Sequence, residues 1–145
     1  VVFINFSVAY LDPKAYKVFD GYKDRRDHDI AGLMILQAGN PRRFELKRAI
    51  QQRYRRMLPP VTIQAALRHI DYVAKLIGPD HVGIGSDFDG VSGMTPQGLE
   101  DVSKFPALVR GLLEMGYADG DVRKIMGENL LRVMRRNEEV AKQLA

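Results

Sequence analysis

Two aspartates one residue apart, Asp87 and Asp89, are the residues whose type and spacing could support catalysis. They follow a short hydrophobic run, residues 82–86, and they open a loop that is rich in glycine, serine and threonine. We interpret the run as a strand, and catalytic groups of α/β folds lie at the carboxyl ends of strands. A carboxylate there can hold a metal-bound water or exchange a proton with a leaving group. Asp87 is therefore a candidate catalytic residue.

A structural role is the alternative for both aspartates. An aspartate in a turn can accept hydrogen bonds from the backbone N–H groups that follow it. Asp89 lies further into the loop than Asp87, so it is the stronger candidate for such a capping residue. The spacing alone leaves both interpretations of Asp87 open.

The composition limits the kinds of protein to consider. The chain has 145 residues, a net charge of +4 and no cysteine. This length suits one domain with a core, and the absence of cysteine excludes disulfides, thiolate metal sites and cysteine nucleophiles within it. No apolar run approaches the roughly 18 residues of a membrane-spanning helix, and the cellular compartment stays open. The chain opens inside an apparent buried strand, as if it were cut from something longer.

The hydrophobic pattern predicts two strands, each followed by helices. The first strand covers residues 1–6 and is expected to be central in its sheet. Helical pieces with uncertain bounds follow to residue 40, and a basic helix starts at Pro41. The clearest helix has Thr62 as its expected N-cap and Gly78 as its end. Further helices are expected at about 102–115 and 119–142, with Asp119 or Asp121 as a cap and Gly127 as a break.

Two strands that are hydrophobic throughout indicate a parallel sheet covered on both faces. Two strands alone do not make a stable sheet, and a complete (β/α)₈ barrel needs about 250 residues. We therefore predict an α/β fold that is the C-terminal portion of a (β/α)₈ TIM-type barrel, with two parallel strands plus several helices. Residues 1–145 would form a single partial barrel domain, truncated on its N-terminal side.

Several motifs in the same order resemble the C-terminal part of the renal (membrane) dipeptidase family of zinc peptidases. They are HVGIGSDFDGV, TPQGLEDVSKFPALVRGLLEMGY and GENLLRVM, together with the earlier segments VVFINF and RHIDYV. The resemblance covers nearly the whole chain, though only loosely between residues 12 and 58. Because several separate motifs agree, it is more specific than a single DFDG would be.

This resemblance implies a zinc-dependent dipeptidase that holds two zinc ions and cleaves the peptide bond of dipeptides. In the family, a His-x-Asp pair, a bridging Glu and two later histidines bind the zinc ions. An aspartate at the end of the last strand lies beside the metal-bound water and the substrate, and its position in the motif is that of Asp87. Asp87 is thus the implied catalytic and substrate-binding residue. The metal ligands would lie upstream of Val1, so this chain alone is expected to be inactive and to bind no zinc tightly.

The three histidines do not replace the missing metal ligands. His28 is flanked by charged residues in what we interpret as a solvated loop, and its neighbour Asp29 does not give the His-x-Asp spacing. His69 lies at the edge of an apolar helix face, where a packed or hydrogen-bonded histidine is the usual finding. His81 precedes the second strand, at the end of the sheet opposite to the site.

Two other functions compete with the peptidase interpretation, namely a non-catalytic α/β module and a basic nucleic-acid-binding domain. The second is suggested by seven cations between Arg42 and Arg56 against one acid, Glu45. These charges are spread around the predicted helix, so a solvated outer face of a barrel is the simpler interpretation. The expected partners are a dipeptide, the N-terminal half of the barrel and a second copy in a homodimer, with no nucleic acid and no transmembrane segment.

One buried polar residue is expected outside the site. Asn129 lies on the apolar side of its helix, beside Met126, Leu130 and Val133. A buried amide must be hydrogen-bonded, so we predict that Asn129 attaches its helix to a loop.

Overall fold

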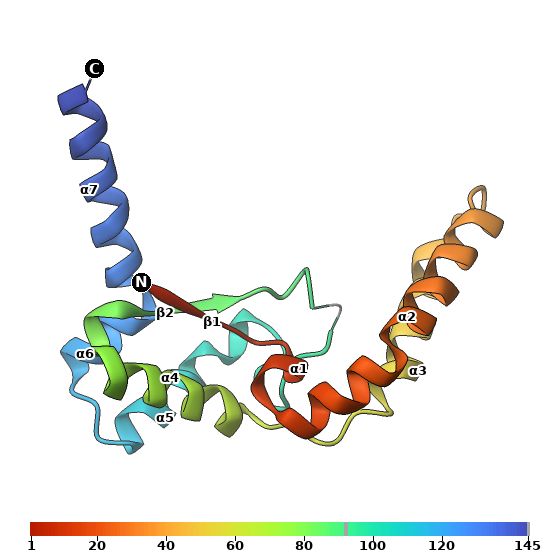
Figure 1. The fold of residues 1–145 in the computed structure, drawn as a ribbon, viewed down its shortest axis with the longest axis horizontal. Helices are drawn as coiled ribbons and strands as arrows, with labels where there is room; N and C mark the ends of the chain where they lie inside the picture. The colour runs from red at the N-terminus through yellow and green to blue at the C-terminus, as the bar shows by residue number, and fades with distance from the viewer. Residues whose placement is uncertain (92, 145) are drawn as a thin grey trace.

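Two parallel strands lie at the centre of the protein, whose computed structural model describes residues 1–91 and 93–144 (Figure 1). Strand β1 (Val2–Asn5) pairs with β2 (Val82–Ser86), and Ile4 lies opposite Ile84. The next pair is Asn5 with Ser86, so β2 carries one extra residue, Gly85, as a bulge. The predicted pairing of adjacent parallel strands is confirmed.

Most of the other described residues lie in helices. They are α1 (Val8–Leu11), α2 (Pro13–Leu36), α3 (Arg43–Arg55), α4 (Ile63–Ile77), α5 (Phe105–Glu114), α6 (Asp119–Arg123) and α7 (Asn129–Leu144). Short helical turns, Pro79–His81 and Val102–Lys104, precede β2 and α5. Within residues 1–91 and 93–144, no helix combines the length and apolarity needed to cross a bilayer.

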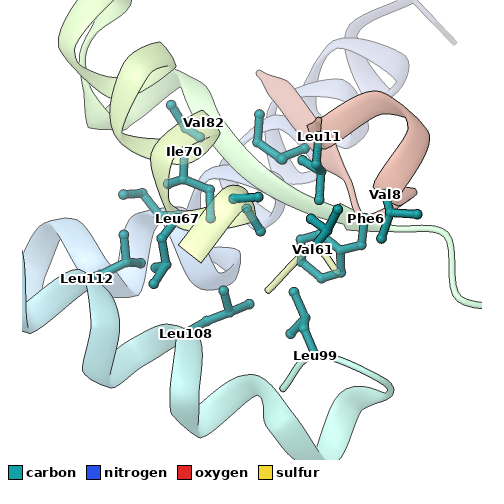
Figure 2. Packing of buried hydrophobic residues seen from close by; sticks show 14 of the residues in the cluster. Phe6, Val8, Leu11, Val61, Leu67, Ile70, Val82, Leu99, Leu108 and Leu112 are labelled. Atoms are coloured by element: carbon teal, nitrogen blue, oxygen red, sulfur yellow. The ribbon is translucent and has the colours of Figure 1, made fainter. Parts of the chain in front are cut away.

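Helix α4 carries the main apolar face of the core. Ala66, Leu67, Ile70 and Ala74 recur at helical spacing and are buried. Figure 2 shows Leu67 and Ile70 packed among Leu108 and Leu112 of α5 and Val82 of β2. Burying each such side chain stabilises the fold by about 1.5–3 kcal/mol. Of the other apolar residues at helical spacing on this face, Ile63 and Val73 are partly buried against the core, whereas Ile77 at the helix end is exposed.

Helices α2 and α3 form a hairpin that projects from the body, on the side to which the β2 arrow points (Figure 1). Asp12 starts α2, because its carboxylate accepts a hydrogen bond from the Ala15 N–H at 2.8 Å and Pro13 occupies the first turn. The Tyr22 and Tyr54 rings pack between the helices with centroids 5.1 Å apart. The Tyr54 hydroxyl donates to the Asp29 carboxylate at 2.6 Å. The hairpin is therefore held by its own contacts.

Several predicted helix ends are wrong by a few residues. Helix α3 begins at Arg43, after a turn at Pro41. Ala118 precedes α6, so Asp119 and Asp121 lie inside its first turn and neither is the cap. Thr62 occupies the N-cap position of α4 without a side-chain hydrogen bond. The predicted end of α4 at Gly78 is confirmed. The predicted break at Gly127 is confirmed as well, since its φ and ψ of 166° and −27° are not helical.

One edge of β1 carries no partner strand among the described residues. Val2 and Phe3 are 47% and 42% exposed, and only Ile4 of this strand is fully buried. This does not match the expected central strand, because central strands are covered on both sides. The observed class is α/β with two parallel strands and helices.

Candidate active site

Asp87 lies at the carboxyl end of β2, where the chain turns away from the sheet. The turn forces positive φ angles on two residues that are not glycine, 31° at Ser86 and 65° at Asp87. Aspartate tolerates this left-handed region better than most residues do, and such conformations often occur at functional sites. The Asp87 side chain is exposed and faces the same edge of the sheet as the end of β1.

The side chain of Asn5, the last residue of β1, holds the Asp87 carboxylate. Asn5 Nδ2 donates to Asp87 Oδ2 at 2.9 Å, and Asn5 Oδ1 accepts from the Ser7 N–H at 2.7 Å. The Ser7 contact fixes which end of the amide is the oxygen, so the NH₂ group must face Asp87. The amide thereby orients one carboxylate oxygen and leaves the other, Oδ1, without an Asn5 contact.

Phe88 separates the two aspartates and anchors the loop. Its ring contacts the fully buried Phe6 ring with centroids 5.8 Å apart, and the Phe105 ring at 6.1 Å. Because Phe88 turns inward, Asp87 and Asp89 on either side of it both turn outward and are exposed. The DFD pattern is thus one inward aromatic anchor between two outward carboxylates.

Gly90 provides the space that the Asp87 carboxylate occupies. A Cβ atom at Gly90 would overlap Asp87 Oδ1, so any side chain there would displace the carboxylate. The loop is also closed by backbone bonds, since the Val91 N–H donates to the Asp87 carbonyl at 3.0 Å and the Val8 N–H donates to the Met94 carbonyl at 2.9 Å. These contacts fix the loop to α1 and to the strand end.

Asp89 was the expected capping residue, and its side chain has no hydrogen bond within residues 1–91 and 93–144. It lines a cleft of about 540 Å³ together with residues of α3. The two aspartates therefore face different surroundings: Asp87 faces Asn5 at the strand end, and Asp89 faces the hairpin.

The histidines lie apart from one another and from Asp87. His69 Nε2 donates to the Leu11 carbonyl at 3.1 Å, which confirms the expected hydrogen-bonded histidine. His28 is exposed on α2, so the predicted loop is wrong although the exposure is as expected. His81 lies before β2, at the amino end of the strand. In the described part of the chain, no group of three or more His, Asp or Glu residues is arranged to hold a metal ion, so these residues do not fit a zinc site.

A cleft of about 940 Å³ lies at the opposite end of β2 from Asp87. It contains the ion pair between Lys124 and Asp80, whose Nζ and Oδ1 atoms are 2.7 Å apart. The bond from Lys124 lowers the pKa of the Asp80 carboxyl below its usual value. Asn129 at the wall of this cleft is occupied by the Pro79 and Val82 carbonyls. Lys124 is thus paired with Asp80 and the Asn129 amide has a structural role, whereas the Asp87 carboxylate at the carboxyl end of β2 stays exposed and is the candidate for catalysis.

Asn5 is the residue that sequence reasoning missed. It is the one polar residue of the segment VVFINF, and it ends the first strand as Asp87 follows the second. Polar residues at the carboxyl ends of adjacent parallel strands meet at one edge. The polar residue at the end of the first strand was visible in the sequence, but its contact with Asp87 could be inferred only once the pairing of the two strands was known.

Comparison with known proteins identifies the family of the chain. The family model described as membrane dipeptidase (peptidase family M19) matches residues 1–145. Dipeptidase verJ of Clonostachys rogersoniana is 49% identical over 80 residues, which are 55% of this chain and 20% of the relative. Dipeptidase tcpJ of Claviceps purpurea is 48% identical over 80 residues, 55% of this chain and 19% of the relative. Dipeptidase ataJ of Aspergillus terreus is 55% identical over 73 residues, 50% of this chain and 18% of the relative.

The matched segment thus spans about a fifth of the length of these curated relatives. The family match, by contrast, extends over every residue of the chain and includes both strands, the loop with Asp87 and the helices around them. The chain belongs to the membrane dipeptidase family, peptidase family M19.

Proposed function

We propose that residues 1–145 are the C-terminal part of a dipeptidase, a single partial domain whose remaining barrel strands lie outside this segment. The open edge of β1 supports this arrangement, because its backbone can pair with another parallel strand. The exposed apolar side chains of Val2 and Phe3 on the sheet faces also fit a sheet that is covered on both sides in the complete domain. Family membership supports the reaction, hydrolysis of the peptide bond of a dipeptide.

Asp87 is the catalytic and substrate-contacting residue in this proposal. The observation that carries the assignment is its carboxylate at the carboxyl end of β2, exposed and held by Asn5 at 2.9 Å. Oriented in this way, the carboxylate can accept a proton from the attacking water and return a proton to the departing amine. In this proposal, Asn5 orients the Asp87 carboxylate during both proton transfers.

Peptidase family M19 is generally zinc-dependent. The described residues form no metal-binding cluster, so we place the zinc ligands of the complete enzyme outside residues 1–145. Proton transfer at Asp87 is the chemical contribution that we assign to this segment.

The assignment is tested by comparing Asp87→Asn with Asp89→Asn in the complete enzyme that contains this chain. Asn in place of Asp87 keeps the shape but removes the proton acceptor, so kcat for a dipeptide should fall by roughly 10² to 10⁴. Asp89→Asn removes the same charge two residues away and should change kcat much less. Both proteins must show the same thermal midpoint as the parent. The reverse ranking of kcat would refute the role of Asp87.

A further inference from the structure

One face of helix α3 forms a cationic wall beside the loop that carries Asp87. Phe44, Lys47, Arg48, Gln51 and Arg55 recur three or four residues apart, so they share this face. They line the 540 Å³ cleft, and its opposite wall consists of Phe88, Asp89 and Gly93. We refer to it as the hairpin cleft. Its volume lies within the range of small-molecule sites, roughly 300–1,000 Å³.

Three other cations in or next to α3 have partners of their own. Arg42 pairs with Glu45 at 2.9 Å, Arg43 stacks on Phe44 at 4.9 Å, and Arg53 stacks on Tyr54 at 5.8 Å. The basic residues of this helix therefore do not form one continuous face. Arg48 is exposed to solvent and Lys47 and Arg55 are half-buried, and all three line the cleft.

The hairpin cleft holds more positive than negative charge. Within the described ranges, 1–91 and 93–144, neither Lys47 nor Arg48 has an ion-pair partner, and Asp89 has none either. Arg55 Nη2 donates to the Thr95 carbonyl at 3.2 Å, which holds α3 against the loop. Three cations thus face one carboxylate, and two of those cations are available to a ligand.

The cleft adjoins the proposed catalytic group. Phe88 and Asp89 in its wall directly follow Asp87, and consecutive Cα atoms are about 3.8 Å apart. A dipeptide bound at Asp87 would reach the cleft if it directed one side chain past Asp89, the residue that faces the hairpin. We infer that the hairpin cleft binds the side-chain carboxylate of an acidic dipeptide, with Lys47 and Arg48 as specificity-determining residues; this inference rests on the proposed function.

The kinetic test uses the complete enzyme and two pairs of dipeptides, and the members of a pair differ only in having glutamate or glutamine. The first pair is glycyl-glutamate and glycyl-glutamine, and the second is glutamyl-glycine and glutaminyl-glycine. In the pair whose acidic side chain reaches the cleft, the parent enzyme should have a higher kcat/KM for the glutamate peptide than for the glutamine peptide. Lys47→Gln combined with Arg48→Gln should lower that preference about tenfold, because hydrogen bonds between charged groups are strong but this site is partly open to solvent. Added salt should lower the preference as well.

The matched control is Arg42→Gln combined with Arg53→Gln, which removes the same charge from α3 and its N-cap position, outside the cleft. It should leave the glutamate preference unchanged. An equal loss of the glutamate preference in both double variants would show that the net positive charge of the protein, and not the cleft, causes the preference. That result would overturn the inference. A preference that survives Lys47→Gln/Arg48→Gln would overturn it too.

A binding measurement separates this inference from the proposed reaction. Chelator-treated enzyme cannot turn over a zinc-dependent reaction, so calorimetric titration with the same dipeptides reports affinity alone. A glutamate preference that is lost in Lys47→Gln/Arg48→Gln supports the cleft even if no dipeptide is hydrolysed by the zinc-loaded enzyme. Hydrolysis with equal affinity for glutamate and glutamine peptides keeps the proposed function and refutes the cleft.

Discussion

Asn5 and Asp87 are 82 residues apart in the chain, yet they form the closest side-chain contact of the proposed site. The Asn5 amide has two tasks, because Oδ1 accepts from the Ser7 N–H and Nδ2 donates to Asp87. A substitution that keeps the first contact and removes the second can separate folding from the orientation of the carboxylate.

Asn5→Asp is such a substitution. It keeps an oxygen for the Ser7 N–H and places a second carboxylate beside Asp87, where two negative charges repel each other. We expect kcat to fall by about 10- to 100-fold, since small displacements of a reacting group have effects of this size. The thermal midpoint should change little. Asn5→Ala serves as the comparison, since it also loses the Ser7 contact and should lower stability as well as kcat. An unchanged kcat in Asn5→Asp would show that Asn5 does not orient the catalytic carboxylate.

At the scale of elements, α7 is attached to the amino end of β2 by one buried amide. Asn129 is 2% exposed and donates to the Pro79 carbonyl at 2.7 Å and to the Val82 carbonyl at 2.8 Å. The prediction that Asn129 attaches its helix to a loop is confirmed. Its neighbours Leu130 and Val133, expected on the same apolar side, are instead 43% and 36% exposed.

Asn129→Leu should therefore destabilise the protein markedly. The substitution keeps the approximate volume but leaves two carbonyl groups without their donors, and each loss costs about 1–3 kcal/mol. Asn137→Leu, on the exposed side of the same helix, is the control and should have little effect. The comparison is made on the thermal midpoints of the two variants. Equal midpoints would show that the contact contributes no net stability.

A second contact between elements predicts a dependence of stability on pH. The Asp71 carboxylate of α4 accepts from Lys75 at 2.8 Å and from the Tyr117 hydroxyl at 3.0 Å. The bond from Lys75, with that from Tyr117, lowers the pKa of Asp71 below its usual value. Burial, with the bond to Asp71, raises the pKa of Tyr117 to about 12.

Because the pKa of Asp71 is lower in the folded protein, its contribution to stability is present above the unfolded value, about 3.9. The contribution is lost as the pH falls through the folded value. We expect the stability difference between the parent and Asp71→Asn to be constant above about pH 5 and to shrink below about pH 4. Chemical unfolding at a series of pH values measures this difference. Glu138→Gln on the exposed part of α7 controls for the change in net charge, and a difference that grows in acid would contradict the assignment.

The sequence predicted those elements whose pattern is strong and local. The face of α4, the two strands, the strand-end position of Asp87 and the break at Gly127 all follow from residue spacing. Helix α2 was not bounded because Gly21 and Gly32 and a dense charge cluster interrupt its pattern. The contact of Asn5 with Asp87 and the position of α3 beside the loop depend on tertiary packing, which residue spacing does not report.

At the scale of the whole molecule, the isolated chain exposes apolar surface on its first strand and on its last helix. Val1, Val2 and Phe3 are 39%, 47% and 42% exposed, and α7 exposes Leu131 and Met134 at 47% and 49%. An unpaired strand edge with apolar side chains is prone to association. We therefore expect the isolated 145-residue chain to associate in a concentration-dependent manner, which sedimentation measures. Phe3→Lys should weaken this association, and a monomer at high concentration would contradict the open-edge interpretation.

The isolated chain is also expected to bind zinc weakly and to hydrolyse no dipeptide. A catalytic zinc usually has about three protein ligands, and no described residues form such a group. The measurement is bound metal after dialysis against zinc, together with dipeptide cleavage. About two equivalents of tightly held zinc with turnover would show that the active site is misplaced.

The α2–α3 hairpin leaves the body after α1 and rejoins it before α4, and both junctions lie at one place. Val8, Pro60 and Val61 line the same small cleft, although about fifty residues separate them along the chain. The free energy of closing a loop grows only slowly with its length. The part of the hairpin beyond Ala15 and Phe19, which pack on the core, can therefore be shortened or exchanged while β1, β2 and α4 keep their contacts. This outer part of the hairpin is thus a segment that can be exchanged as a unit. Recombination at its two junctions would transfer one wall of the cleft between relatives and leave the Asn5–Asp87 pair in place.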